Sequence, residues 1–163
     1  MYDISMHEAQ PVQYMERTRL YYEAQGFDRA YQWAQHDDVP FKPLSKPLSE
    51  SRVAVVTTGA RYDRLMTDPR FVDSGDIDEL PSHLFARDLA WDKEATHLND
   101  LGSYLPVRIL QTLAENGTIG SVASRFHCLP TEYSQRRTRE TDAPEVLSRC
   151  QEDHADLALL VPL

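Results

Sequence analysis

The amino-acid sequence predicts an α/β domain with an open, mostly parallel sheet and flanking helices. Three short apolar runs, 53–58, 119–123 and 157–161, alternate with two patterns typical of amphipathic helices, 106–116 and 143–154. The runs are rich in Val, Ile and Leu and lack polar alternation, which is typical of strands covered on both faces. Strands that are joined through helices lie parallel, with right-handed crossovers. We therefore expect the three runs to be adjacent, parallel and buried.

The N-terminal segment predicts two helices ahead of this domain. Apolar residues recur at roughly helical spacing over 11–25, a proline suits the first turn, and Gly26 suits a left-handed stop. A second, short helix is expected to begin at Asp28 and to carry Tyr31 and Trp33.

Three prolines follow these helices. Pro40, Pro43 and Pro47 each fix the backbone dihedral φ and remove a hydrogen-bond donor, so we expect residues 39–48 to form an extended arm on the domain. We therefore divide the chain into N-terminal helices and a proline-rich arm, 1–48, and an α/β domain, 49–163.

The first core strand is predicted by β-branched residues at 52–58, which end at Gly59. Residues 60–92 are acidic and are interrupted by two prolines and a glycine. We expect a long loop there, in which only 82–87 resembles a strand.

The two helices of the domain have clear ends. Pro106 suits the first turn of one helix, and Asn116 with the glycine after it suits its stop. In the other helix Asp142 is the expected N-cap. Glu145, three residues later, is placed to accept a hydrogen bond from the backbone N–H of Asp142, as in a capping box. Cys150 falls on the apolar face of this helix, where we expect an inert core thiol.

The nearly all-apolar run at 156–163 predicts a central strand. No helix follows to cover this strand, so the sequence indicates a Rossmann-like or flavodoxin-like fold that is incomplete at its C-terminus. We expect the uncovered strand to expose an apolar patch that favours association.

We expect near-complete burial at four positions in the core elements, Val55, Leu110, Leu147 and Leu159.

Composition and charge exclude several classes of function. The 163 residues include 17 Lys and Arg against 26 Asp and Glu, a net charge of −9 at pH 7, which would repel a phosphate backbone. The longest apolar run, 157–163, is far shorter than the roughly 20 residues of a membrane helix, and the N-terminus lacks a basic and apolar leader. We therefore expect a soluble cytoplasmic protein with neither a nucleic acid nor a membrane as partner.

The sequence lacks the common nucleotide and serine-hydrolase motifs. It contains no G-x-G-x-x-G, no G-x-x-x-x-G-K-[ST] and no G-x-S-x-G, so no cofactor is expected. Ligands of open α/β sheets bind at the carboxyl ends of strands. Here those ends predict a site from Gly59 onward, at 124–128, and after Leu163.

Histidines near these ends are candidates for acid–base chemistry. His97 and Asp100 lie three residues apart before a helix, where the imidazole acts as an acid, base or ligand, or else only forms local hydrogen bonds. His127 and Cys128 follow the second strand and, with His97, Asp100 or His83, have the side chains of a metal site, but no spacing requires one. We therefore assign no metal.

A polar loop before the last helix is a candidate carboxylate site. It contains Tyr133, Arg136 and further arginines close to a helix N-terminus, where guanidinium groups and free N–H groups hold anions. The alternative interpretation is a solvated charged loop.

Four segments in combination resemble a known family. They are FKPLSKPLSESRVAVVTT at 41–58, GSVASRFH at 120–127, YSQRRT at 133–138 and DAPEVL at 142–147. From about residue 12 to residue 163 the chain is similar to the selenoprotein B family of glycine/sarcosine/betaine reductase and D-proline reductase, above all to its short members.

The resemblance implies an oxidoreductase whose nucleophile lies outside this chain. In that family the last strand is followed at once by a selenocysteine- or cysteine-x-x-cysteine element and then by a further helix and strand. A selenolate or thiolate from this element would cleave a C–N bond reductively. We therefore expect a UGA codon after Leu163 that was read as a stop, and a 163-residue chain that is inactive by itself.

The resemblance and the topology together give the candidate walls of the pocket. His97, Asp100 and His127 are acid–base candidates, and Tyr133 and Arg136 are candidates for substrate binding. Arg136 is expected to hold the carboxylate of a small amino acid or betaine, and His127 or His97 to protonate the departing amine. We expect these side chains and the end of the chain to converge on one cleft.

Two other interpretations remain open. In the first, the chain is a non-catalytic α/β module that docks a partner subunit through an exposed sheet edge. In the second, the arginine loop binds a small carboxylate without redox chemistry. The substrate, the electron donor and the oligomeric state do not follow from the sequence.

Overall fold

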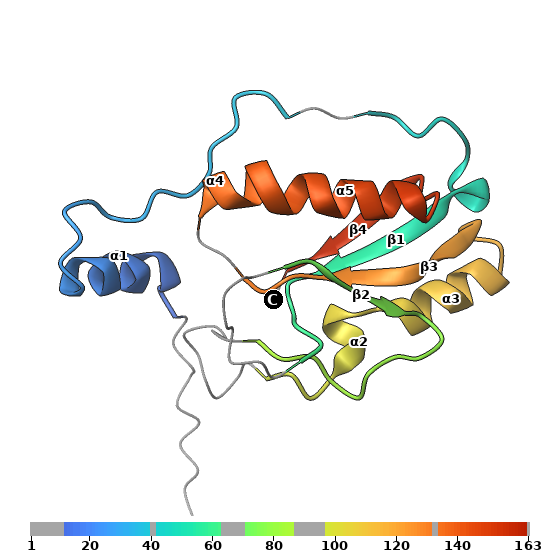
Figure 1. Ribbon diagram of the computed structural model, residues 1–163, viewed down its shortest axis with the longest axis horizontal. Coiled ribbons are helices and arrows are strands. Elements are labelled where there is room, and N and C mark those ends of the chain that lie inside the picture. Colours follow the sequence, from blue (N-terminus) through green and yellow to red (C-terminus); the bar gives the residue numbers. More distant parts are fainter. Residues whose placement is uncertain (1–11, 40–41, 63–70, 87–96, 132–133, 163) are drawn as a thin grey trace, which may run out of the picture.

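The computed structural model describes residues 12–39, 42–62, 71–86, 97–131 and 134–162. The domain contains a four-stranded sheet with one helical layer on each face (Figure 1). An open α/β fold with a mostly parallel sheet is thus confirmed. Its strands are β1 (Arg52–Thr57), β2 (Asp73–Asp76), β3 (Ser121–Cys128) and β4 (Leu157–Val161).

The order of strands in the sheet is β2-β3-β1-β4. β1 pairs in parallel with β3 on one side and with β4 on the other, as the sequence predicts. The register between β1 and β3 shifts: Val53 is opposite Val122, but Val55 is opposite Phe126, so β3 contains extra residues at a bulge. Because the number of extra residues is even, the side chains keep their faces across the bulge: Val122 and Phe126 belong to the cluster under α3, and Ala123 belongs to the cluster under α5.

Helix α3 (Val107–Glu115) covers one face of the sheet. Its buried residues Val107 and Leu110 join Val53, Val55 and Phe126 in the larger core cluster. The helix ends at a turn around Gly117, whose positive φ of 77° favours glycine. The predicted helix and the burial of Val55 and Leu110 are confirmed.

The opposite face is covered by one continuous helical segment. It begins as α4 (Gln135–Arg137), passes through a π-helical stretch, η2 (Thr138–Asp142), and continues as α5 (Ala143–Glu152). Pro144 donates no hydrogen bond, and its ring crowds the preceding turn, which accounts for the wider winding before it. Cys150 of α5 packs with Ala54 and Val56 in the smaller core cluster, so the expected burial of this thiol is confirmed.

The expectation of an irregular loop over 60–92 is wrong in part, because β2 lies within it and pairs antiparallel with β3. Its sequence, Asp-Ser-Gly-Asp, has little intrinsic preference for a strand, so backbone pairing with β3 determines its conformation. Gly75 is required there, since a Cβ atom would collide with the Phe126 ring. In the described part of 82–87, Phe85 forms only an isolated bridge with Ala60.

The prediction that 156–163 is a central strand is wrong. Among the strands that the structure describes, β4 is at the edge and pairs with β1 alone. Leu159 is 40% exposed and Leu160 is 67% exposed, and Leu147 on α5 is 58% exposed, which contradicts the burial expected for Leu159 and Leu147. A continuous apolar run indicates that a strand can be buried on both faces, but it does not reveal whether a neighbour covers it.

The second strand begins later and continues further than predicted. Residues 118–120 form a turn, in which Thr118 bonds to Asn116, and β3 then runs to Cys128. Gly120 packs against the backbone of Glu50, the last residue of the short helix η1 (Leu48–Glu50), and a Cβ atom would prevent this contact. Together these contacts join the end of the arm to the start of the sheet.

In the described part of the N-terminal region, residues 12–39, the structure has one helix, α1 (Tyr14–Ala24), within the predicted range. No helix begins at Asp28, so that expectation is wrong. Instead, Tyr31 contacts the rings of Tyr22 and Trp33, and these aromatic contacts hold the segment in an irregular conformation beside α1. Among the residues that the structure describes, no helix combines the length and apolar character that a membrane crossing requires.

Candidate functional site

A groove of about 590 Å³ lies between α5 and the edge strand β4. Most of its lining is aliphatic, from Val146 and Leu147 on α5 and from Ala158 and Leu160 on β4. Cys150 also lines it. The groove is therefore an apolar surface between a helix and a sheet edge.

One end of the groove carries polar groups. Thr57 and Thr58 line it at the carboxyl end of β1, beside Val161 and Pro162 at the carboxyl end of β4. Thr138 and Asp142, from the π-helical stretch, lie in the same lining. This is the edge at which open α/β sheets bind ligands, so the groove is the candidate binding site.

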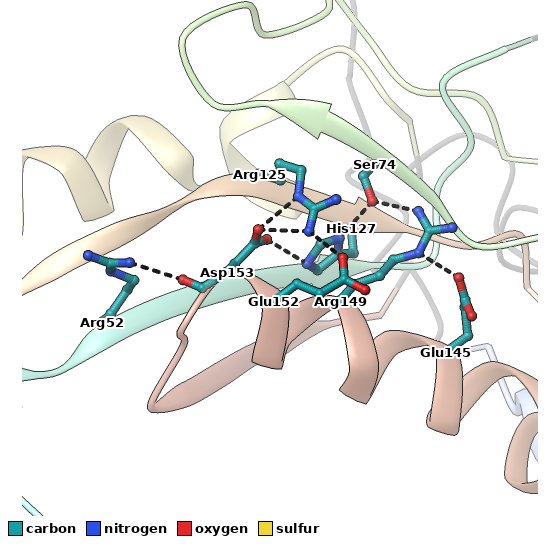
Figure 2. Close-up of polar contacts among 8 residues, drawn as sticks. All are labelled: Arg52, Ser74, Arg125, His127, Glu145, Arg149, Glu152 and Asp153. Carbon is teal, nitrogen blue, oxygen red and sulfur yellow. Dashed lines mark hydrogen bonds and ion pairs between the residues drawn. The ribbon is translucent and has the colours of Figure 1, made fainter.

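A buried polar network lies under α5 near the other edge of the sheet (Figure 2). Its centre is His127 of β3, which is fully buried. The His127 Nδ1 atom lies 2.9 Å from the Ser74 hydroxyl on β2, and its Nε2 atom lies 3.3 Å from a carboxylate oxygen of Asp153, just after α5. Arg149 of α5 donates a hydrogen bond of 2.7 Å to the same hydroxyl.

These contacts define the protonation of the imidazole. Because Ser74 accepts from Arg149, its own hydroxyl proton is free to be donated to Nδ1 of His127. We assign the imidazole proton to Nε2, since a lone pair there would face the Asp153 carboxylate. Burial lowers the pKa of His127, and the cationic Arg125 and Arg149 lower it further, against the opposing effect of Asp153.

Asp153 is the anchor of this network. Its carboxylate accepts a 2.8 Å hydrogen bond from the Arg125 guanidinium, and its backbone carbonyl accepts one of 3.1 Å from Arg52. Arg125 also pairs with Glu152, and both hydrogen bonds raise its pKa. The network thus fastens the end of α5 to β1 and β3.

The chain of contacts from Ser74 through His127 to Asp153 has the order of a Ser–His–Asp triad. A triad histidine must exchange a proton with the leaving group of its substrate. The His127 ring is fully buried and none of the three residues lines the groove, so their arrangement indicates a structural role.

Both cysteines of the sequence are buried. Burial, together with the nearby Asp73 carboxylate, raises the pKa of Cys128 to about 12, although Arg61 opposes the shift. Burial and Asp153 raise the pKa of Cys150. Since the thiolate is the nucleophile, neither sulfur is prepared for attack.

The structure separates several of the site residues that the sequence suggests. His97 and Asp100 are exposed before the short helix α2 (Leu101–Tyr104), on the α3 side of the sheet, and Asp100 caps α2 by accepting a hydrogen bond from Gly102. Arg136 is exposed on α4, on the opposite side. Tyr133 lies outside the described residues.

None of the described candidates lines the groove, so the expected convergence on one cleft is not found there. Arg136 comes nearest in sequence, two residues before Thr138 in the groove wall. The acid–base roles of His97, Asp100 and His127 and the binding roles of Tyr133 and Arg136 stay predictions.

Sequence reasoning missed the residues that surround His127 in the buried network, among them Ser74, Arg149 and Asp153. Ser74 was not recognisable because its strand has no strand-like pattern, and Arg149 looked like an ordinary surface residue of a helix. Asp153 carries one signal, since a carboxylate at the C-terminal end of a helix is unfavourable unless cations compensate it. Within the described residues, no cluster of three His, Cys, Asp or Glu side chains is arranged to hold a metal ion.

Comparisons with models of protein families, with curated proteins and with solved structures find no match to this chain.

Proposed function

We propose that this chain is the substrate-binding part of a selenoprotein B-type reductase of the cytoplasm. The reaction is reductive cleavage of a C–N bond in a small amino acid or a betaine-like carboxylate. The observation that supports the proposal is the groove that reaches the carboxyl ends of β1 and β4, the usual ligand position in an open α/β sheet.

In this proposal the nucleophile comes from outside residues 1–163. Both cysteines of the sequence are buried, and the pKa of each is raised, so a thiolate or selenolate must be supplied by another segment or by a partner reductase subunit. It attacks the carbon of the C–N bond, and the amine leaves with the bonding electron pair and takes up a proton. A thiol then attacks the sulfur or selenium, the carbon is released with a proton, and an external dithiol reduces the resulting disulfide or selenenyl sulfide.

Arg136 is the proposed anchor of the substrate carboxylate. Its planar guanidinium can donate two parallel hydrogen bonds to a carboxylate, which the ammonium of lysine cannot reproduce. Arg136 is exposed, and Thr138, two residues later, forms part of the groove wall.

Calorimetric titration of the chain with glycine, sarcosine, betaine and D-proline tests the binding step. At least one should bind, and Arg136→Lys should weaken its affinity about tenfold. Arg108→Lys is the matched control, because Arg108 is exposed on α3 at the opposite face of the sheet. An equal loss in both variants, or no binding of any of the four compounds, would contradict the assignment.

The reductive step has a separate test. Joined after Leu163 to a segment with a selenocysteine- or cysteine-x-x-cysteine element, the chain should consume one dithiol for each amine released. The proposal fails if this extended chain consumes no dithiol with any of the four compounds.

A second candidate function, a module that docks a partner subunit, is favoured by a different observation. The β4 edge is unpaired in the described sheet and presents the exposed Leu159 and Leu160. A partner strand would extend the sheet there. Carboxylate binding that depends on Arg136 supports the reductase, whereas a chain that binds none of the four compounds supports the docking module.

A further inference from the structure

We propose that the groove between α5 and β4 binds an α-amino acid with a long aliphatic side chain, of the size of leucine or norleucine. The side chain of this ligand lies between the helix and the strand. The inference rests on the proposed function, because it names the substrate class of the same site. It concerns the part of the groove that glycine, sarcosine and betaine are too small to fill.

The groove exists because α5 is held over one side of the sheet. Arg149 of α5 donates a hydrogen bond to Ser74 of β2, and Asp153, just after α5, pairs with Arg125 of β3. The core cluster beneath the helix accordingly contains residues of β1 and β3 and none of the described residues of β4. The neighbouring face of β4 is left uncovered beside α5 (Figure 1).

The walls of this space are aliphatic. Val146 and Leu147 form the wall on α5, and Ala158 and Leu160 form the wall on β4. The volume of about 590 Å³ is in the range of sites for organic ligands much larger than glycine. Because the free energy of binding grows with the apolar area removed from water, each methylene that lies between these walls adds affinity.

The lining disfavours other chemical classes of ligand. Among the described residues that line the groove, none is aromatic, so a quaternary ammonium group would lack the ring faces that attract it. None of them is Lys, Arg or His, so the phosphates of a nucleotide would meet no cation there. An aliphatic body is the part of a ligand that this lining suits.

The polar end of the groove indicates the orientation of the ligand. Asp142 and Thr138 line this end, and Arg136 lies two residues before Thr138. A carboxylate in the wall favours an ammonium group of the ligand, whereas a guanidinium favours a carboxylate. An α-amino acid has both groups on one carbon. Its charged head therefore belongs at the polar end, and its side chain extends along the aliphatic walls.

Calorimetric titration with a homologous series tests the class of ligand. The series is glycine and racemic alanine, 2-aminobutyrate, norvaline and norleucine. The affinity of the chain should rise about fourfold for each added methylene. A flat series would overturn the proposal and favour a second copy or another protein as the occupant of the groove.

A further compound tests the role of the amino group. It is 4-methylpentanoate, which is leucine without that group. It should bind about tenfold more weakly than leucine, because it lacks the ammonium that faces the acidic wall. Equal affinity of the two compounds would overturn the assignment of an amino acid.

A matched pair of variants locates the side chain of the ligand. Leu160→Ala should lower the affinity for norleucine about fivefold and leave that for glycine within about twofold, since glycine does not reach this wall. Ile109→Ala, at a similarly exposed position on α3, should change neither. An equal effect of both variants on norleucine would show that its side chain lies elsewhere.

Nuclear magnetic resonance of the wild-type chain decides the location even if Leu160→Ala fails to fold. Norleucine should shift the methyl resonances of Val146 and Leu147, which line the groove, and leave those of Ile109 in place. Shifts at Ile109 without shifts at the two groove residues would overturn the proposal.

Two outcomes separate the ligand class from the reductase chemistry. If glycine or sarcosine binds and the homologous series is flat, the aliphatic ligand is wrong and the proposed function stands. If affinity rises along the series but the chain extended by a selenocysteine- or cysteine-x-x-cysteine element consumes no dithiol with any compound, the proposed function is wrong. The groove is then a binding site for aliphatic amino acids without reductive chemistry.

Discussion

His127 and Cys150 show how far the environment of a single side chain can be predicted from the sequence. The position of His127 at the end of an apolar run suggests an acid or base at a site, but β3 continues through it and places the ring under α5, where it meets Ser74 and Asp153. These partners come from β2 and from the residue after α5, and no local pattern around His127 indicates them. Cys150 was predictable, because an apolar stripe on a helix indicates burial directly.

The two thiols give a prediction at the residue scale. Cys128 and Cys150 should not react with a disulfide reagent such as dithiobis-nitrobenzoate at pH 8 in the native chain, because burial raises the pKa of both. In urea both should react within seconds to minutes, at the rate of a cysteine in a short peptide. Rapid reaction of one thiol in the native chain would contradict this prediction. It would show that the thiol is accessible and make it a candidate nucleophile.

At the scale of elements, the predictable parts are those in which local pattern and packing agree. β1 and α3 have strong apolar patterns and clear ends, and both lie where the sequence places them. β2 was missed because its conformation comes from pairing with β3 and from the space that Gly75 leaves for Phe126. β4 was recognised as a strand but misplaced as central, since its residues carry no information on what lies beside them.

Leu110 and Leu147 form a matched pair that tests the two helical layers. Leu110 of α3 is 7% exposed, so Leu110→Ala should lower the free energy of unfolding by about 2 to 5 kcal/mol through lost burial and a cavity. Leu147 of α5 is mostly exposed, so Leu147→Ala should change it by less than about 0.5 kcal/mol. Urea unfolding of both variants measures the difference. A large loss with Leu147→Ala would mean that a partner covers the groove under the conditions of the measurement.

On the scale of the whole molecule, the groove presents a continuous apolar surface. Leu147 and Leu160 both line it and are mostly exposed, whereas the exposed Ile109 belongs to α3, in the other helical layer. Contiguous apolar surface favours association, and single exposed residues do not. The sequence predicts the association, because the run at 157–161 is too apolar for solvent, but not the groove that α5 forms with it.

Light scattering should therefore find the chain associated at high concentration. Leu160→Lys should shift the chain toward the monomer. A charge in the apolar patch would have to be desolvated on contact, and a lysine on an edge strand disfavours pairing with a further strand. Ile109→Lys, a substitution of similar exposure away from the groove, should leave the association unchanged. A wild-type monomer at high concentration, or an equal effect of both lysines, would contradict association through β4.

The unlike edges of the sheet also determine how far such an association can grow. The β4 edge carries no charged side chain, while the opposite edge, β2, carries Asp73 and Asp76, which discourage a further strand. Two copies that meet at β4 across a two-fold axis therefore place their acidic β2 edges outermost, and the assembly closes. A fibre needs two compatible edges on every copy, and this sheet has one. Loss of the monomer should thus produce discrete soluble particles, and substitutions that remove the charges of Asp73 and Asp76 are the ones expected to convert them into filaments.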